Sequence, residues 1–143
     1  MIGISDLKEY RAICAEIVRR ENRVQQLANH QSSVVQSSAN FPYNLHRVRV
    51  VGVQYPPEAD AERKTIALLK HRKRLIEEAV DEISEPAIRY AVQRKYIDSC
   101  YGERVTWDTI ADELDDGNTS DAIRVKVKRY FRLVELKTCE NER

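Results

Sequence analysis

The residues best suited to chemistry in this sequence are the arginines and lysines of SDAIRVKVKRYFRLVE, residues 120–135. Guanidinium and ammonium groups bind phosphate oxygens, and a guanidinium can also donate two hydrogen bonds to the edge of guanine. The basic residues in and just after this stretch are Arg124, Lys126, Lys128, Arg129, Arg132 and Lys137. They outnumber the acidic residues Asp121 and Glu135, although the net charge of the whole chain is only +1. This composition is typical of a surface that binds an anionic polymer.

The spacing of the apolar residues decides whether this stretch is a strand or a helix. Ile123, Val125 and Val127 alternate with basic residues, which is the period of a strand, but the alternation fails after Lys128. A helical period would place four residues on one apolar face: Ile123, Val127, Tyr130 and Val134. Because only the helical period fits the whole stretch, we predict a helix over 120–135. Its opposite side would carry Arg124, Lys128, Arg129 and Arg132, with Val125 among them, while Lys126 flanks the apolar face.

A shorter helix is predicted just before it, over TWDTIADEL, residues 106–114. The hydroxyl group of Thr106 can cap its first turn. In the turn DDGNTS that follows, Gly117 and Asn118 tolerate positive φ, and Thr119 or Ser120 can cap the basic helix. The predicted core of this helix–turn–helix comprises Trp107, Ile110, Ala111, Leu114, Ile123, Val127 and Tyr130.

A helix–turn–helix with a basic second helix predicts binding of double-stranded DNA in the major groove. Residues near the start of the second helix would approach base edges, with Arg124 best placed to contact guanine and Val125 a thymine methyl group. Later cations would hold phosphates. The predicted DNA-binding residues are Thr119, Ser120, Asp121, Arg124, Val125, Lys128, Arg129 and Arg132.

Two long amphipathic segments earlier in the chain predict an antiparallel helical hairpin, coiled-coil-like in its spacing. Residues 5–28 form the first, with Ser5 or Asp6 as the cap, and residues 58–83 form the second. Their apolar positions are Leu7, Tyr10, Cys14, Ile17, Val24, Ala28, Ile66, Leu69, Ile76, Val80 and Ile83. Such a hairpin could also serve as a homodimer interface.

The connector over 29–56 is expected to differ from its neighbours. NHQSSVVQSSAN is typical of a loop, whereas Arg47 and Arg49 alternate with valines as in a short strand or an extended crossing segment. Disorder and pairing with another chain are both open alternatives at this length.

The complete pattern predicts an all-α protein in two parts. Residues 1–83 would form the hairpin with its connector, and residues 84–143 a three-helix domain. The remaining helix of that domain, which comes first in the chain, is predicted over 86–98. Pro86 disfavours helical geometry at Glu85 and then suits the first turn of a helix.

The C-terminal part resembles region four of bacterial sigma factors, in the form found in small phage and prophage proteins. The matching stretches are EPAIRYAVQRKYID, TWDTIADEL and GNTSDAIRVKVKRYF, and LKEYR near the N-terminus extends the resemblance loosely. The resemblance implies a regulator of phage or mobile-element transcription that binds DNA, with RNA polymerase as a further partner.

Three departures limit this resemblance. The turn DDGNTS is longer than that of a standard helix–turn–helix, SCYGER precedes the first of the two helices, and residues 41–56 have no counterpart. The chain also has no room for the sigma region that opens promoters, so a complete sigma factor is not expected.

Other functional classes have little support. The histidines His30, His46 and His71 are scattered, and no phosphate-binding or nucleophile motif is present, so we expect no enzyme, no cofactor and no metal. Three widely spaced cysteines (Cys14, Cys100 and Cys139) predict reduced thiols and a cytoplasmic protein. No stretch approaches the roughly 18 apolar residues of a membrane span, so no membrane partner is expected.

The main alternative is a protein-interaction module. A fold similar to sigma region four could bind RNA polymerase, another regulator or a defence protein instead of DNA. The basic run KHRKR at 70–74 could add contacts to a DNA backbone, but a solvated helix face is the better explanation for it.

Overall fold

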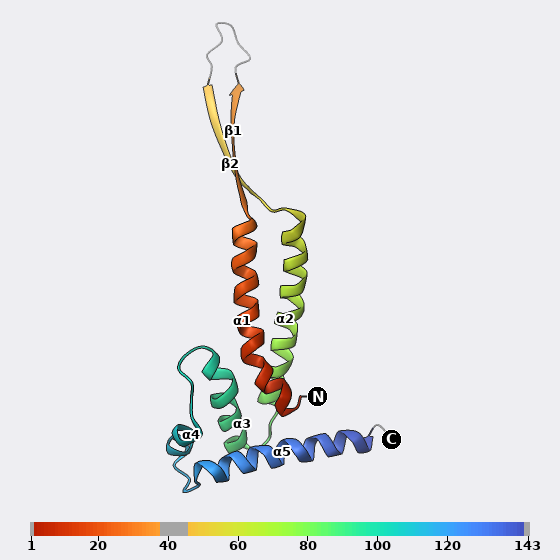
Figure 1. Cartoon of the computed structure of the whole chain (residues 1–143), viewed down its shortest axis with the longest axis vertical. Helices are drawn as coiled ribbons and strands as arrows, with labels where there is room; N and C mark the ends of the chain where they lie inside the picture. Colours follow the sequence, from red (N-terminus) through yellow and green to blue (C-terminus); the bar gives the residue numbers. More distant parts are fainter. Residues whose placement is uncertain (1, 38–45, 142–143) are drawn as a thin grey trace. The chain divides into compact units, whose positions relative to one another are not determined.

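The structure is a computed structural model that describes residues 2–37 and 46–141. Its elements are, in order, α1 (Ile4–Leu27), β1 (Asn29–Ser37), β2 (His46–Gln54), α2 (Pro57–Asp81), α3 (Pro86–Val92), the π-helical η1 (Gln93–Ile97), the 3₁₀ turn η2 (Asp98–Cys100), α4 (Trp107–Leu114) and α5 (Ser120–Asn141) (Figure 1). The chain is mainly helical, in agreement with the predicted class, and the paired strands β1 and β2 are the exception.

The chain divides into two compact units. Unit 1 combines residues 1–17 with residues 69–143, and unit 2 consists of residues 18–68. The division falls within the two long helices and not after residue 83. The first turns of α1 and the last turns of α2 therefore belong to the same compact unit as α3, α4 and α5.

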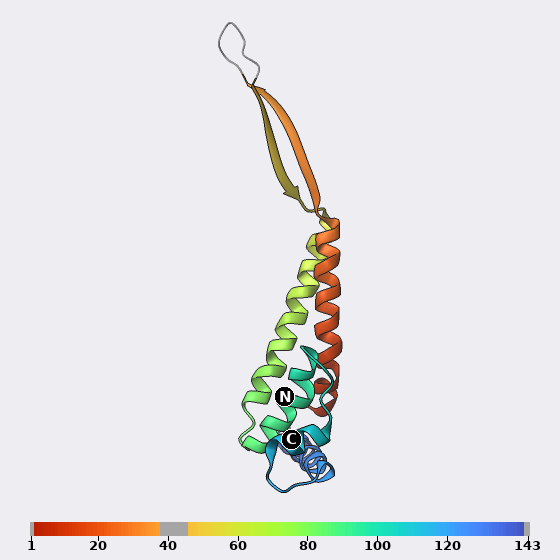
Figure 2. The ribbon, with the colours of Figure 1, turned by 90° about the vertical axis from the view of Figure 1, so that its left-hand side faces the viewer.

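Unit 2 contains the connector, which forms a β-hairpin between the ends of the two long helices (Figure 2). β1 and β2 pair antiparallel from Asn29 with Gln54 to Ser37 with His46. The strand alternative for the second half of the connector was therefore right. The loop expected over NHQSSVVQS was wrong, because this stretch pairs with the residues of β2, which follow it by 9 to 25 positions in the chain. Residues 38–45 lie outside the described part.

Ion pairs connect α1 to α2 in both units. In unit 2, Glu62 accepts a hydrogen bond of 2.8 Å from Arg20. In unit 1, the Arg72 guanidinium donates to the carboxylates of Asp6 and Glu9, at 3.3 and 2.9 Å. Residues later in α1 thus pair with residues earlier in α2, as an antiparallel hairpin requires.

The start of α1 differs slightly from the prediction. The helix begins at Ile4, and the Gly3 N–H donates to the Asp6 carboxylate at 3.0 Å. Asp6 thus caps the helix by reaching back from its first turn, as the acidic residue of a capping box does. Ser5 takes no part in a hydrogen bond that the structure describes at this end.

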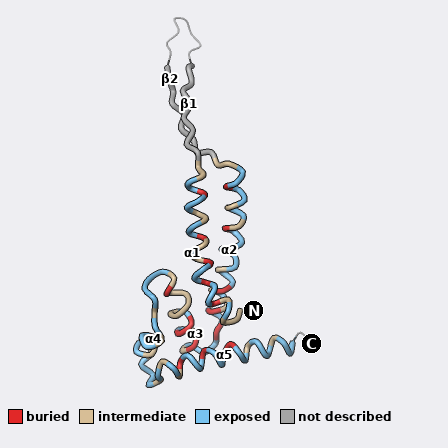
Figure 3. The backbone as a smooth tube through the Cα atoms, in the orientation of Figure 1, coloured by how far each residue is buried: buried red, intermediate tan, exposed pale blue. Residues whose placement is uncertain are grey.

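The core of unit 1 gathers where α1, α2, α3 and α5 meet (Figure 3). Its most deeply buried side chains include Leu7, Tyr10, Ile76, Val80, Val92, Ile110 and Val127. The fully buried Tyr10 donates a short hydrogen bond to Glu77, and its oxygen lies 3.3 Å from that of Tyr101. This polar contact attaches the segment before α4 to the two long helices.

The helix predicted over residues 86–98 is only partly an α-helix. Pro86 opens α3 after an extended Glu85, as predicted, but the α-helical geometry ends at Val92 and a π-helical segment follows to Ile97. The hydroxyl group of Ser99 donates to the Lys95 carbonyl at 2.7 Å, which helps to close the helical run at Cys100. The helical period of the sequence did not predict this change, and none of the residues of the π-helical segment is fully buried.

Candidate nucleic-acid interface

α4 begins and ends as its sequence predicts. Thr106 is the N-cap, and its hydroxyl oxygen accepts a hydrogen bond from the Thr109 N–H at 3.3 Å. At the other end Asp115 adopts the left-handed conformation, with φ of 45°. The helix is thus eight residues long and leads directly into the turn.

The turn between α4 and α5 is held by side-chain contacts to its own backbone. Gly117 has φ of 77°, as predicted, whereas the second residue with positive φ is Asp115 and not Asn118. The Asp116 carboxylate accepts from the Asn118 N–H at 3.0 Å and from its side-chain amide at 2.8 Å. These two hydrogen bonds lower the pKa of the Asp116 carboxyl group.

α5 is a helix from Ser120 to Asn141, about 33 Å long at 1.5 Å per residue. Thr119 caps it, since its hydroxyl oxygen accepts from the Ala122 N–H at 3.3 Å. Residues 123–128, where the sequence alternates, lie inside this helix. The strand alternative for the basic stretch is therefore wrong.

The buried side of α5 consists of Ile123, Val127 and Phe131. Of the other predicted core residues, Ile110 is fully buried, while Trp107, Ala111, Leu114 and Tyr130 are half-buried. Phe131 was not among the predicted core residues. A single helix period cannot tell whether residue 130 or residue 131 is turned more deeply into the core.

The predicted DNA-binding residues lie on the outer side of α5 and at its start. Ser120 is half-buried, and the other seven are exposed: Thr119, Asp121, Arg124, Val125, Lys128, Arg129 and Arg132. Val125 has an exposed fraction of 51%, so an apolar side chain lies in the middle of this surface. We call these eight residues the α5 face.

The cations of the α5 face are free to bind an external partner. Between Asp121 and Glu135 the sequence contains no acidic residue. Arg124, Lys128, Arg129 and Arg132 form no ion pair with any residue that the structure describes. Their charges therefore remain uncompensated within the described chain, which favours contact with phosphates.

A three-residue contact connects α4 to the π-helical segment. The Glu113 carboxylate accepts hydrogen bonds from Arg94 Nε at 2.9 Å and from the Tyr90 hydroxyl at 2.8 Å. These bonds, that from Arg94 first, lower the pKa of the Glu113 carboxyl group from 4.5 to about 2. The contact orients α4 and, through it, the α5 face.

An aromatic contact supports α4 from the same segment. The ring of Trp107 lies edge-on to that of Tyr96 at 6.5 Å, and the Lys95 ammonium is 5.6 Å from the Trp107 centroid. Lys95 also donates to the Val105 carbonyl at 2.8 Å. Burial raises the pKa of Tyr96, while the nearby positive charge of Arg124 opposes that rise.

The charge on α4 is opposite to that on α5. Three aspartates of α4 and the turn are exposed and form no ion pair with residues in the described ranges: Asp108, Asp112 and Asp115. Carboxylates repel phosphates, so α4 is a poor contact for a nucleic-acid backbone.

The basic run at 70–74 is partly used inside the protein. Arg72 pairs with Asp6 and Glu9, and the Lys73 ammonium lies 3.9 Å from Glu77 and 5.2 Å from the Tyr101 ring centroid. These two cations stabilise unit 1 and are less available to a partner than those of the α5 face.

The described residues contain no group of three or more His, Cys, Asp or Glu side chains able to hold a metal ion. Nor does any helix among them have the length and apolar character needed to cross a membrane.

Comparison with protein-family models, with curated proteins and with solved structures finds no significant match to this chain.

Proposed function

We propose that the protein binds double-stranded DNA in a sequence-specific manner, with α5 in the major groove, and regulates transcription. The observation that carries this proposal is the α5 face. It presents four uncompensated cations on the exposed side of a helix that follows a short helix and a turn. The major groove is about 12 Å wide and admits one α-helix.

The position of each residue on α5 suggests its role. Arg124 lies one turn from the start of the helix, where recognition helices approach base edges. Val125 is exposed beside it and offers methyl groups to a thymine. Lys128, Arg129 and Arg132 lie further along and would hold phosphates.

The resemblance of residues 84–136 to sigma region four suggests the biological setting. We propose that the protein regulates genes of a phage or a mobile element in a bacterial cytoplasm. RNA polymerase is a candidate second partner in this proposal, and the helical hairpin is a candidate homodimer interface.

The salt dependence of binding to duplex DNA tests the proposal. If four or more phosphates are contacted, affinity should fall between 50 and 200 mM salt by a factor of roughly 150 or more. Each phosphate contact contributes about 0.9 to the slope with which the logarithm of the affinity falls against the logarithm of the salt concentration. Selection of bound fragments from random duplexes would then identify the site, and a palindrome would indicate a dimer. No retention on DNA at low salt would contradict the proposal.

The acidic surface of α4 favours a second candidate, a protein-interaction module. α4 presents exposed aspartates, and the second half of α5 presents the exposed apolar residues Leu133 and Leu136; charged and apolar surfaces of this kind suit a protein partner better than DNA. Under this alternative, binding to RNA polymerase or another regulator would depend on these residues and not on Arg124.

A further inference from the structure

A basic groove lies between the start of α1 and the α5 face. Its volume is about 510 Å³, and its polar lining consists of Lys8, Lys128, Arg129, Arg132 and Glu135. Ile4, Val125 and Phe131 provide its apolar lining. The groove thus joins residues from opposite ends of the sequence within unit 1.

The two walls of the groove are in close contact at one end. Gly3, just before α1, lies so near to α5 that a Cβ atom at this position would be only 3.0 Å from Glu135 Oε1. From there Ile4 and Lys8, one turn apart on α1, continue along one wall. Glu135 thus lies where α1 and α5 come close together, and cations line the rest of the groove.

Lys8 is available for an external anion. It is exposed, and it makes no ion pair within the part of the chain that the structure describes. The acidic residues near it in sequence, Asp6 and Glu9, are paired with Arg72 instead. Four cations and one carboxylate consequently border the groove.

We infer that this groove holds the sugar–phosphate backbone of one DNA strand, with Lys8 as a phosphate ligand. The inference rests on the proposed binding of DNA by α5. A helix in the major groove has a phosphate backbone on each side. On the α4 side the protein presents exposed aspartates, and on the α1 side it presents Lys8, so the α1 side is the one suited to hold a strand.

The inference adds a part of the helical hairpin to the DNA interface. Lys8 contacts phosphate without reading sequence, so it contributes to affinity for every duplex alike. Glu135 repels phosphates and limits how far along α5 the strand can follow.

Titration of duplex DNA at several salt concentrations tests this inference. In Lys8→Gln, the loss of affinity between 50 and 200 mM salt should be about 3.5-fold smaller than in the wild type, because one phosphate contact is removed. Lys8→Arg should keep the wild-type salt dependence. Glu135→Gln should bind more tightly than the wild type at low salt, since it removes the one carboxylate of the groove.

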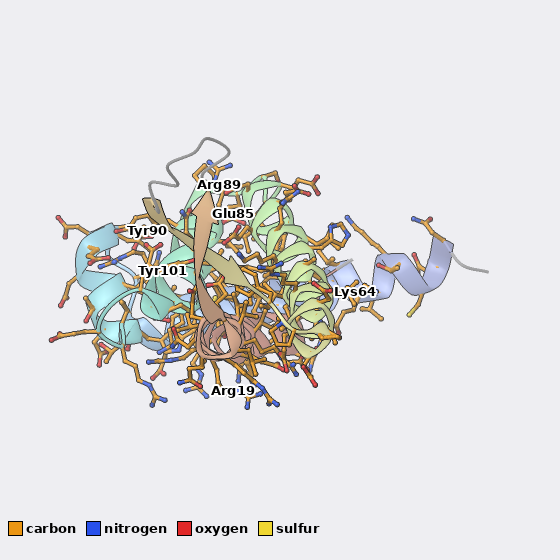
Figure 4. The ribbon with its side chains drawn as sticks, turned by 90° about the horizontal axis from the view of Figure 1, so that it is seen from above. Arg19, Lys64, Glu85, Arg89, Tyr90 and Tyr101 are labelled. Carbon is orange, nitrogen blue, oxygen red and sulfur yellow. The ribbon has the colours of Figure 1, made fainter. Side chains whose placement is uncertain are left out.

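Lys64→Gln is the matched control, because Lys64 is an exposed lysine of α2 (Figure 4) and is not among the residues that line the groove. Its salt dependence should equal that of the wild type. Thermal unfolding of each variant shows whether the fold is retained.

The outcomes separate this inference from the proposed function. If Arg129→Gln weakens DNA binding but Lys8→Gln matches the wild type, the groove does not hold a strand although α5 binds DNA. If the wild type binds no duplex at low salt, the proposed function fails, and the inference with it. Binding of polyglutamate that depends on Lys8, without binding of DNA, would assign the groove to an acidic polypeptide and overturn the inference.

Discussion

Arg124 and Lys128 lie one turn apart on α5, and we expect their substitutions to have different effects on DNA binding. Arg124→Ala should relax the preference at one base pair, at a cost of about 1–3 kcal/mol for the preferred sequence. Lys128→Ala should weaken binding to all sequences alike, because a phosphate contact does not depend on the base. Affinities for the selected site and for single-base variants of it give the comparison.

An equal loss on every sequence for both variants would show that the orientation of α5 is wrong. Arg19→Ala serves as the control, since Arg19 is an exposed arginine of α1 outside the α5 face and the groove. It should leave both affinity and base preference unchanged.

Glu113 makes the stability of unit 1 depend on pH. Its carboxyl group has a pKa of about 2 in the folded protein, below the ordinary 4.5, so its contribution is complete above pH 4.5 and is lost as the pH falls towards 2. Asp116, whose pKa is also lowered, acts in the same direction. Glu113→Gln should therefore show a smaller fall in Tm between pH 5 and pH 2 than the wild type.

Asp112→Asn is the control for this measurement. Asp112 is the neighbouring acid on α4, and it has no hydrogen-bond or ion-pair partner among the residues that the structure describes. An identical acid profile for Glu113→Gln and the wild type would mean that the contact with Arg94 and Tyr90 does not stabilise the fold.

At the scale of elements, the start of α5 depends on the cap from Thr119. Thr119→Ala removes the oxygen that accepts from the Ala122 N–H and should lower the free energy of unfolding by about 0.5–2 kcal/mol. Thr119→Ser keeps the hydroxyl group and should lie close to the wild type. Urea unfolding of the three proteins provides the values, and equal stability of the alanine variant would refute the cap.

The helices could be predicted from the sequence where local signals mark them. Thr106, Thr119 and Pro86 mark helix starts through hydrogen bonding and fixed φ, which are properties of a few neighbouring residues. The strand β1 could not be predicted in this way. Its polar sequence becomes a strand by pairing with β2, and such pairing depends on distant residues.

The candidate site could be predicted only in part, for the same reason. The helical period of residues 120–135 is enough to predict the eight residues of the α5 face. The position of Lys8 beside it depends on how α1 and α5 pack, and the only available signal was an exposed lysine near the start of an amphipathic helix. The half-buried state of Trp107 likewise depends on how far Tyr96 and Lys95 cover it.

At the scale of the whole molecule, the C-terminal helices need the hairpin for a complete core. Phe131 has an exposed fraction of only 5%, and Ile4 of α1 and Val80 of α2 lie near it, bordering the same grooves. A fragment of residues 84–143 lacks both helices and would expose this face of α5. We expect the fragment to unfold at a lower temperature than the full chain, since burial of one phenylalanine stabilises by about 1.5–3 kcal/mol.

A chain in which a short glycine-rich turn replaces residues 29–54 is the matched comparison, because it retains both segments of unit 1. It should keep a cooperative transition close to that of the full chain. A fragment as stable as the full chain would mean that the C-terminal helices form an independent domain.

The discontinuity of unit 1 also affects the order in which the protein can fold during its synthesis. The N-terminal segment of the unit leaves the ribosome before unit 2, whereas α5 follows later by about 5–20 seconds at ordinary elongation rates of roughly 5–20 residues per second. Unit 2 is continuous in sequence and can form during this time. Leu7 and Tyr10 cannot be buried until the second segment of unit 1 has been synthesised. A nascent chain halted before α5 therefore exposes the apolar side of α1 and lacks the α5 face, so it would be a substrate for chaperones or proteases.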